Sequence, residues 1–215
     1  MVRKIFEGLY AFIWDDYRQN NCNSYLIDSG KRILIDPGHS HLFSHVKQGL
    51  LSLKIDPVSI DLIIITHAHP DHMEAAQLFS KPTQLSMGMT DFEYLKELAG
   101  DYYKVPEPDF FLTQGNLKVG NLEFEVIDTP GHTPGSICLY WNKHGALFTG
   151  DLIFDQGIGR TDLPGGSSKD LKESILKVET LQAQYLLPGH GGVISGQNAV
   201  RENFKQVKEY WFRYL

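Results

Sequence analysis

The stretch His67-Ala68-His69-Pro70-Asp71-His72 places three imidazoles and one carboxylate within a single short turn. Packing so many polar side chains together is costly unless they bind something. Imidazole and carboxylate are the ligands of borderline divalent cations such as zinc, manganese and ferrous iron. Histidine makes up only 9 of the 215 residues, so this H-x-H-x-D-H pattern would arise by chance with a probability on the order of one in a thousand. We therefore interpret the stretch as a metal site that holds two cations.

The residues before this stretch indicate the fold class. The apolar run Leu62-Ile63-Ile64-Ile65 is typical of a buried strand. The histidines therefore follow the carboxyl end of a strand, where α/β architectures place their functional loops. Along the whole chain the order of expected elements is β-rich, α, β-rich, α. Two sheets packed face to face, with helices on both outer faces, satisfy this order best, which predicts an α/β protein.

The expected elements follow from hydrophobic periodicity and from turn residues. A hairpin is predicted around Ser29-Gly30, because apolar alternation flanks this turn on both sides. Either Ser167 or Ser168 is the expected N-cap of the helix that follows them. The expected strands lie at 4–14, 22–28, 32–36, 61–66, 117–119, 122–127, 136–140, 146–149 and 185–187. The expected helices lie at 42–53, 73–79, 91–99, 168–181 and from about 198 onward, with a loop at 101–110.

Composition narrows the classes of partner and compartment. The formal net charge is −6, which argues against nucleic acid or an anionic membrane as a partner, because both favour a basic face. Cys22 and Cys138 lie in apolar strand-like segments without C-x-x-C spacing, so both are expected to be reduced core residues. The apolar N-terminal stretch is short and ends at Asp15-Asp16. No signal peptide or membrane span is therefore expected, and the predicted location is cytoplasmic.

Three motifs farther along the chain share one pattern, in which glycine stands beside a metal-binding type of side chain. They are T-P-G-H-T-P-G at 129–135, F-T-G-D at 148–151 and L-P-G-H-G-G at 187–192. Glycine allows close backbone approach and positive φ angles, both of which suit a tight loop at a strand end. The candidate ligands in these motifs are His132, Asp151 and His190.

With these four motifs in this order, the chain resembles the metallo-β-lactamase-fold hydrolases over essentially its whole length. The resemblance implies an αβ/βα four-layer sandwich of two mixed β-sheets, with helices on both outer faces and a site for two metals at one edge. It also implies the ligand sets. His67, His69 and His132 would hold the first metal, Asp71, His72 and His190 would hold the second, and Asp151 would bridge both.

The implied cofactors are two divalent cations, with zinc as the first choice and iron or manganese as alternatives. With such a site, no serine or cysteine nucleophile is needed. A hydroxide shared by the two metals would attack the substrate, while the metals polarise a carbonyl or phosphoryl oxygen. Asp71 and Asp151 are therefore the candidate catalytic carboxylates. Asp36 ends another apolar strand, and we expect it to orient one of the ligand histidines.

The segment Gly157–Gly166 is similar to that of the glyoxalase II-like proteins, the hydroxyacylglutathione hydrolase-like subgroup of the same family, and to that of the related persulfide dioxygenases. In glyoxalase II the fold hydrolyses a glutathione thioester. That resemblance implies hydrolysis of a small-molecule thioester, either a hydroxyacyl-glutathione or a related one, with no nucleic-acid or membrane partner. Only residues 191–215 follow the last candidate ligand, His190. We therefore expect one domain over 1–215, without the extra C-terminal helical domain of full-length glyoxalase II.

Two other functions stay open on the sequence. The related persulfide dioxygenases use a single iron, and the positions that match its ligands are His67, His132 and Asp151. This triad is contained in the two-metal set, so ligand identity does not separate the two enzymes. The Leu163–Gly166 continuation favours the hydrolase. A non-catalytic metal-binding module is the remaining alternative, and it is disfavoured because no ligand is missing.

Two features outside the ligand set each have two interpretations. Arg160 is a candidate substrate-binding residue, although an ion pair with Asp162 accounts equally for a charged side chain there. The terminal aromatic residues 211–215 predict helix packing, and their number also allows a contact between copies of the chain in a homo-oligomer.

Overall fold

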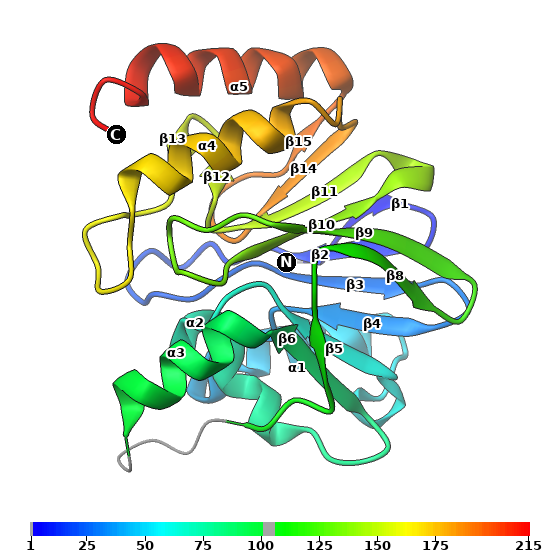
Figure 1. Ribbon diagram of the computed structural model, residues 1–215. Helices are drawn as coiled ribbons and strands as arrows, with labels where there is room; N and C mark the ends of the chain where they lie inside the picture. The colour runs from blue at the N-terminus through cyan, green and yellow to red at the C-terminus, as the bar shows by residue number, and fades with distance from the viewer. Residues whose placement is uncertain (1, 101–105) are drawn as a thin grey trace.

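The computed structural model describes residues 2–100 and 106–215, which are arranged in four layers (Figure 1). Two β-sheets lie face to face in the middle, and helices cover each outer side. This arrangement confirms the predicted α/β sandwich with two mixed sheets. Among the described helices, none is both long and apolar enough to cross a membrane.

The first sheet contains seven strands in sequence order. Strands β1 to β4 are antiparallel, whereas β4 to β7 are parallel neighbours. The predicted hairpin around Ser29-Gly30 is formed by β3 and β4. The bounds are β1 Val2–Phe6, β2 Leu9–Phe12, β3 Ser24–Asp28, β4 Arg32–Ile35, β5 Leu62–Ile65, β6 Gln84–Gly88 and β7 Phe110–Leu112.

The second sheet contains six strands in the order β15-β14-β11-β10-β9-β8. Its pairs are antiparallel except for β11 and β14, which run parallel. A small separate hairpin, β12–β13, follows β11. The bounds are β8 Gly115–Val119, β9 Leu122–Asp128, β10 Ile137–Trp141, β11 Ala146–Gly150, β12 Ile153–Phe154, β13 Gly157–Ile158, β14 Tyr185–Pro188 and β15 Ile194–Ser195.

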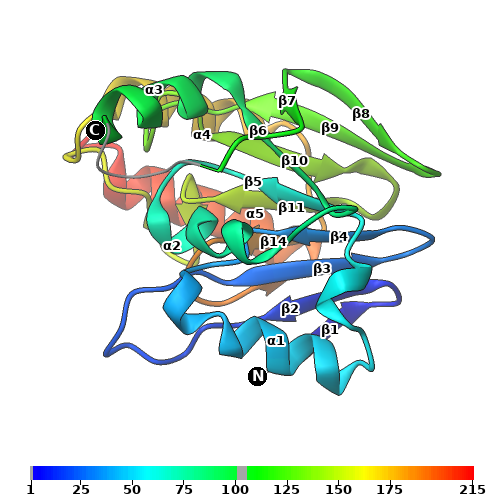
Figure 2. The same ribbon diagram turned by 90° about the horizontal axis from the view of Figure 1, so that it is seen from below.

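Helices α1 to α3 lie on the outer side of the first sheet, as the view from below shows (Figure 2). Helices α4 and α5 cover the second sheet (Figure 1). The side chain of Ser167 accepts a hydrogen bond from the backbone of Asp170 at 3.3 Å, which identifies Ser167 as the N-cap of α4. The bounds are α1 Ser44–Ser52, α2 Pro70–Met73, α3 Met89–Ala99, α4 Ser168–Glu179 and α5 Gln197–Trp211.

Three apolar cores separate these four layers. Tyr25 and Phe148 meet edge-on in the core between the two sheets. Leu50 of α1 belongs to the core beneath the first sheet, and Ile175 of α4 to the core above the second sheet. Burial of these faces drives the sheets and helices together. The metal-binding loops can therefore be held at the rim of a rigid sandwich.

The structure corrects several predicted elements. The β run expected over 4–14 is divided into the hairpin β1–β2, with Gly8 at φ +85° in its turn. The helix expected at 73–79 instead begins as α2 at Pro70, because proline suits the first helical position. It continues as a 3₁₀ helix over Glu74–Leu78. Strands β6 and β7 were not predicted.

Other predictions concern residues near the gap and the cysteines. The loop expected at 101–110 lies partly outside the described residues, and β7 begins at Phe110. Cys22 and Cys138 are both buried and free, as predicted. Among the terminal aromatic residues, Trp211 and Phe212 pack against the α4–α5 core, which supports the helix-packing interpretation.

Candidate metal centre

All seven predicted ligands come together at one edge of the sandwich. The H-A-H-P-D-H loop joins β5 to α2, His132 lies between β9 and β10, Asp151 directly follows β11, and His190 follows β14. The potential ligand atoms form three overlapping groups, and within each group they lie within 4.8 Å of one another. The groups are His67, His69 and His132; His67, His72 and Asp151; and Asp71, His72 and His190.

The carboxylate of Asp151 lies at the middle of this arrangement. Its Oδ1 is 3.2 Å from Nε2 of His72, and its Oδ2 is 3.3 Å from Nε2 of His190. The same Oδ2 lies 3.4 Å from Nε2 of His132. Asp151 therefore touches histidines of both halves of the cluster, which is the position that a bridging ligand needs.

Two buried atoms of the cluster make no hydrogen bond of good geometry within the described residues, namely Nε2 of His67 and Oδ1 of Asp151. The latter has only the charge contact with His72 at 3.2 Å. An unpartnered buried polar atom costs about 1–3 kcal/mol. Cation coordination would satisfy both atoms at once, since imidazole nitrogen and carboxylate oxygen are metal ligands. The donor set therefore fits a divalent-metal site.

Two ligand histidines donate hydrogen bonds from Nδ1, which turns their Nε2 atoms toward the centre of the cluster. His72 donates from Nδ1 to Oδ2 of Asp36 at 2.8 Å, and His132 donates from Nδ1 to the carbonyl oxygen of Arg160 at 2.7 Å. Asp36 is itself held by the backbone N–H and the hydroxyl of Thr66, at 2.8 and 2.7 Å. With Nδ1 occupied in this way, Nε2 is the nitrogen left for a metal. Asp36 thus lies where the sequence predicted an orienting residue.

Burial and charge set the protonation of the candidate ligands. Burial holds the pKa of His67 well below its usual range, which leaves its ring neutral. Burial opposes the charge of His190 as well, but the hydrogen bond and the charge of Asp151 raise the pKa of His190 to about 9. Burial alone would raise the pKa of Asp151, yet the charge of His72 and the hydrogen bond of His190 bring it well below its usual range. The carboxylate is therefore ionised and available as a ligand.

Arg160 contributes through its backbone more than through its side chain. Its guanidinium forms a paired interaction with Asp162, with both N–O distances at 2.9 Å, and the side chain is 65% exposed. The ion pair is thus present, while the carbonyl of Arg160 orients His132. Arg160 also lines the hollow beside the metal centre.

Asp91 was not found from the sequence. It is fully buried in the first turn of α3. Its carboxylate accepts hydrogen bonds from the backbone of Ala68 at 2.7 Å, from Oγ1 of Thr133 at 2.7 Å and from the backbone of Gly135 at 2.6 Å. Asp91 therefore ties the first ligand loop to the loop that carries His132. A lone aspartate near a helix start carries no sequence signal of this role.

Asparagines before β3 were also missed. Asn20 donates from Nδ2 to Oδ2 of Asp71 at 2.8 Å. Asn23 donates from Nδ2 to the carbonyl oxygens of Pro188 and Gly191, both at 3.0 Å. The segment thus orients the ligand Asp71 directly and stabilises the loop that carries His190. Its signal was the concentration of asparagine at 20, 21 and 23.

Two glycines next to ligands are required by close approach. Gly131 has φ +135°, and a Cβ on it would lie 2.2 Å from the backbone nitrogen of Leu171 at the start of α4. A Cβ on Gly189 would lie 2.3 Å from Oδ1 of Asp151 and 2.6 Å from His72. Any side chain at Gly189 would therefore enter the metal centre itself.

A hollow of about 450 Å³ opens beside the cluster. Phe154, Ile158 and Leu163 are the larger apolar side chains that line it. Five of the candidate ligands line it as well, namely His69, Asp71, His132, Asp151 and His190. Phe154 and Ile158 belong to the β12–β13 hairpin. The hollow is therefore lined by both metal-binding and apolar side chains, which suits a small molecule with an apolar portion.

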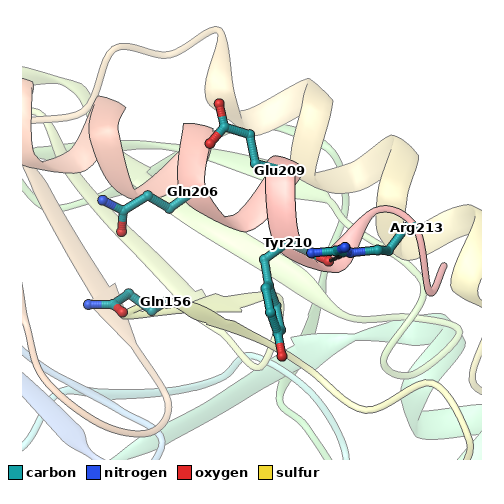
Figure 3. A pocket seen from close by; sticks show the side chains of 5 residues that line it. All are labelled: Gln156, Gln206, Glu209, Tyr210 and Arg213. Atoms are coloured by element: carbon teal, nitrogen blue, oxygen red, sulfur yellow. Dashed lines mark hydrogen bonds between the residues drawn. The ribbon is translucent and has the colours of Figure 1, made fainter.

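A second hollow, of about 430 Å³, lies between α5 and the tip of this hairpin. Gln206 and Tyr210 extend from α5 on the side of Gln156, whereas Glu209 points away (Figure 3). No histidine and no pair of carboxylates lines this hollow. The second hollow therefore lacks the histidines and paired carboxylates that line the first.

Helix α5 holds the β12–β13 hairpin through Asn203. Its Oδ1 accepts from the backbone of Gln156 at 2.8 Å, and its Nδ2 donates to the carbonyl of Phe154 at 2.9 Å. We expect Asn203→Ala to lower the free energy of unfolding by about 2 kcal/mol, because buried backbone groups lose their partners. Amide hydrogen exchange over 153–158 should become faster. The exposed Gln206→Ala on the same helix is the control, and equal protection in both variants would contradict this role for Asn203.

Removal of Asp36 should weaken the half of the centre that contains His72. We expect Asp36→Ala to lower metal affinity about 10- to 100-fold, as loss of a partner behind a ligand does. The measurement is zinc competition with a chromophoric chelator. Asp28→Asn, at the end of β3 in a half-exposed pair with Arg32, is the control. Unchanged affinity in Asp36→Ala would show that His72 does not depend on this hydrogen bond.

Comparison with known proteins agrees with this geometry. A model of the Metallo-beta-lactamase superfamily matches residues 17–190. A probable metallo-hydrolase of Methanocaldococcus jannaschii is 37% identical over 185 residues, which cover 80% of this chain and 88% of that protein. The hydroxyacylglutathione hydrolase GloC of Haemophilus influenzae is 31% identical over 202 residues, covering 86% of this chain and 92% of that protein.

Among solved structures, one of a protein in a di-iron-bound form aligns with a TM-score of 0.68 and 26% sequence identity. The alignment covers 90% of this chain and 95% of that one. The motifs, the converging donor atoms and these matches lead to one conclusion: the chain belongs to the metallo-β-lactamase superfamily.

Proposed function

We propose that the protein is a metal-dependent thioesterase of the glyoxalase II-like kind, which hydrolyses a hydroxyacyl-glutathione or a related small thioester. The observation that carries the proposal is the second ligand group, Asp71, His72 and His190, which converges beside the first. A mononuclear oxygenase needs only two histidines and one carboxylate. A complete second group supports hydrolysis with two divalent cations. The hydroxyacylglutathione hydrolase GloC, with its coverage of 92%, supports the same substrate class.

In this proposal the seven residues hold two cations, with zinc as the first choice, and iron or manganese as the other candidates. Bound there, the metals would supply Lewis acidity toward the thioester carbonyl and would lower the pKa of a water. The side chains of the protein do the remaining work. Asp151 sits between the two ligand groups, and Asn20 keeps Oδ2 of Asp71, the oxygen that faces His190, oriented. Asp36 and the carbonyl of Arg160 prevent the histidine rings from turning.

The hollow supplies the binding surface for the thioester. Phe154, Ile158 and Leu163 would contact the apolar part of the substrate. The Arg160 guanidinium, at the rim, would bind a substrate carboxylate. Its pair with Asp162 is solvent-exposed and therefore weak, so Arg160 can exchange that partner for a substrate carboxylate. A small acidic thioester fits this surface, and the net charge of −6 disfavours nucleic acid. The two free buried cysteines support a reducing, cytoplasmic setting.

The first test is hydrolysis of S-lactoylglutathione by zinc-loaded protein, with a chelator-treated sample as the control. We expect release of free thiol with the loaded protein and a loss of at least about 100-fold after chelation. If no thiol is released with zinc, iron or manganese, the thioesterase proposal is wrong for this substrate class. Oxygen consumption with glutathione persulfide would then test the alternative, in which one iron is held by His67, His132 and Asp151.

A further inference from the structure

A second cluster of metal-binding side chains lies outside the centre. It comprises His39, His41 and Glu74, whose potential ligand atoms lie within 4.8 Å of one another. Nδ1 of His39 is 3.1 Å from Oε2 of Glu74, and Nδ1 of His41 is 4.0 Å from the same oxygen. The two imidazole rings lie side by side with their centroids 4.9 Å apart. The cluster shares no residue with the seven-ligand centre.

We propose that His39, His41 and Glu74 form an additional divalent-cation site. Two imidazoles and one carboxylate match zinc and similar borderline cations, whereas magnesium and calcium prefer oxygen ligands. The side chain of His41 is 63% exposed, while those of His39 and Glu74 are 19% and 22% exposed. Water would complete the coordination from the open side. The site would therefore bind more weakly than the buried centre.

Glu74 also has a purely structural role, which does not explain the whole cluster. Its Oε2 accepts from the backbone N–H and from the hydroxyl of Ser40, both at 2.9 Å. Those bonds hold the start of the 3₁₀ turn Ser40–Leu42. They do not require a histidine on each side of Ser40. Nδ1 of His39 is hydrogen-bonded to this oxygen, whereas Nδ1 of His41, at 4.0 Å, is too far away for a hydrogen bond. A cation between the three side chains would bind both imidazoles and the carboxylate.

The position of the cluster suggests what a cation there would do. The backbone N–H of Gly38 donates to the carbonyl of His72 at 3.1 Å, and the N–H of Ala75 donates to the carbonyl of Gly38 at 2.7 Å. The loop that follows Asp36 is thus already bound to the segment that carries His72. A cation shared by His39, His41 and Glu74 would link the same two segments through side chains. It would stabilise the support of the main centre without touching substrate.

The test is a zinc titration of the chelator-treated protein, read as equivalents bound per chain. We expect His41→Ala to bind about one equivalent less than wild type, because three protein ligands are the usual minimum for an open zinc site. Glu74→Gln should lose the same equivalent while keeping an acceptor for Ser40. His144→Ala, a half-buried histidine in a distant turn, is the control and should bind as many equivalents as wild type.

Thermal unfolding supplies a second readout. Excess zinc beyond the main centre should raise the Tm of wild type by about 5 °C and should leave that of His41→Ala unchanged, since ligand binding to the folded state stabilises it. Equal stoichiometry and equal Tm in wild type and His41→Ala would overturn the proposal. Because this test compares zinc equivalents between variants and does not measure activity, its outcome does not depend on whether the protein hydrolyses a thioester.

Discussion

Asp151→Ala is expected to lower thioester hydrolysis by about 10³-fold or more and to remove bound metal at the same time. The carboxylate lies 3.2 to 3.4 Å from the Nε2 atoms of His72, His132 and His190. No other described carboxylate is in contact with all three rings. In the proposed centre Asp151 would hold both cations, so its loss would remove several kcal/mol of transition-state stabilisation.

The measurement combines kcat/KM with metal content per chain, determined on the same sample. The matched control is Asp155→Ala, an exposed aspartate in the same segment, which should keep both quantities. Circular dichroism should show an intact fold in both variants. An Asp151→Ala protein that kept full activity and full metal content would exclude the bridging role.

His190→Ala separates the two-metal hydrolase from the single-iron alternative. His190 belongs to the group with Asp71 and His72, and it lies outside the His67, His132 and Asp151 triad. For the hydrolase we expect a loss of about 10²-fold or more in kcat/KM, together with about one metal less per chain. A single-iron enzyme would keep its iron and much of its oxygen consumption.

His190 is preferable to His72 for this experiment. The side chain of His72 is fully buried and bonded to Asp36, so its removal would also disturb the fold, whereas the side chain of His190 is 29% exposed. His144→Ala again serves as the control for removal of a histidine. If His190→Ala hydrolysed the thioester as fast as wild type with unchanged metal content, the second ligand group would have no part in hydrolysis.

The ligand loops could be predicted because their signals are local. A run such as Leu62–Ile65 identifies a buried strand, and glycine beside histidine identifies a tight loop at a strand end. Asp36 was found in the same way, as a carboxylate at the end of an apolar strand. Strand β6 was missed, because Gln84–Gly88 contains no β-branched residue and only part of it is buried. Its strand structure depends on parallel pairing with β5 and β7.

Residue types and their order were therefore enough to predict the sandwich, the seven candidate ligands and their likeness to one hydrolase family. The roles of Asp91, Asn20 and Asn203 required the three-dimensional arrangement. Each makes its contacts with residues more than 20 positions away in the chain. Local sequence patterns do not predict such long-range contacts. The cluster of His39 and His41 with Glu74 also required the three-dimensional arrangement. Its partners lie in two separate segments, which meet because the loop after Asp36 packs against the turn that carries His72.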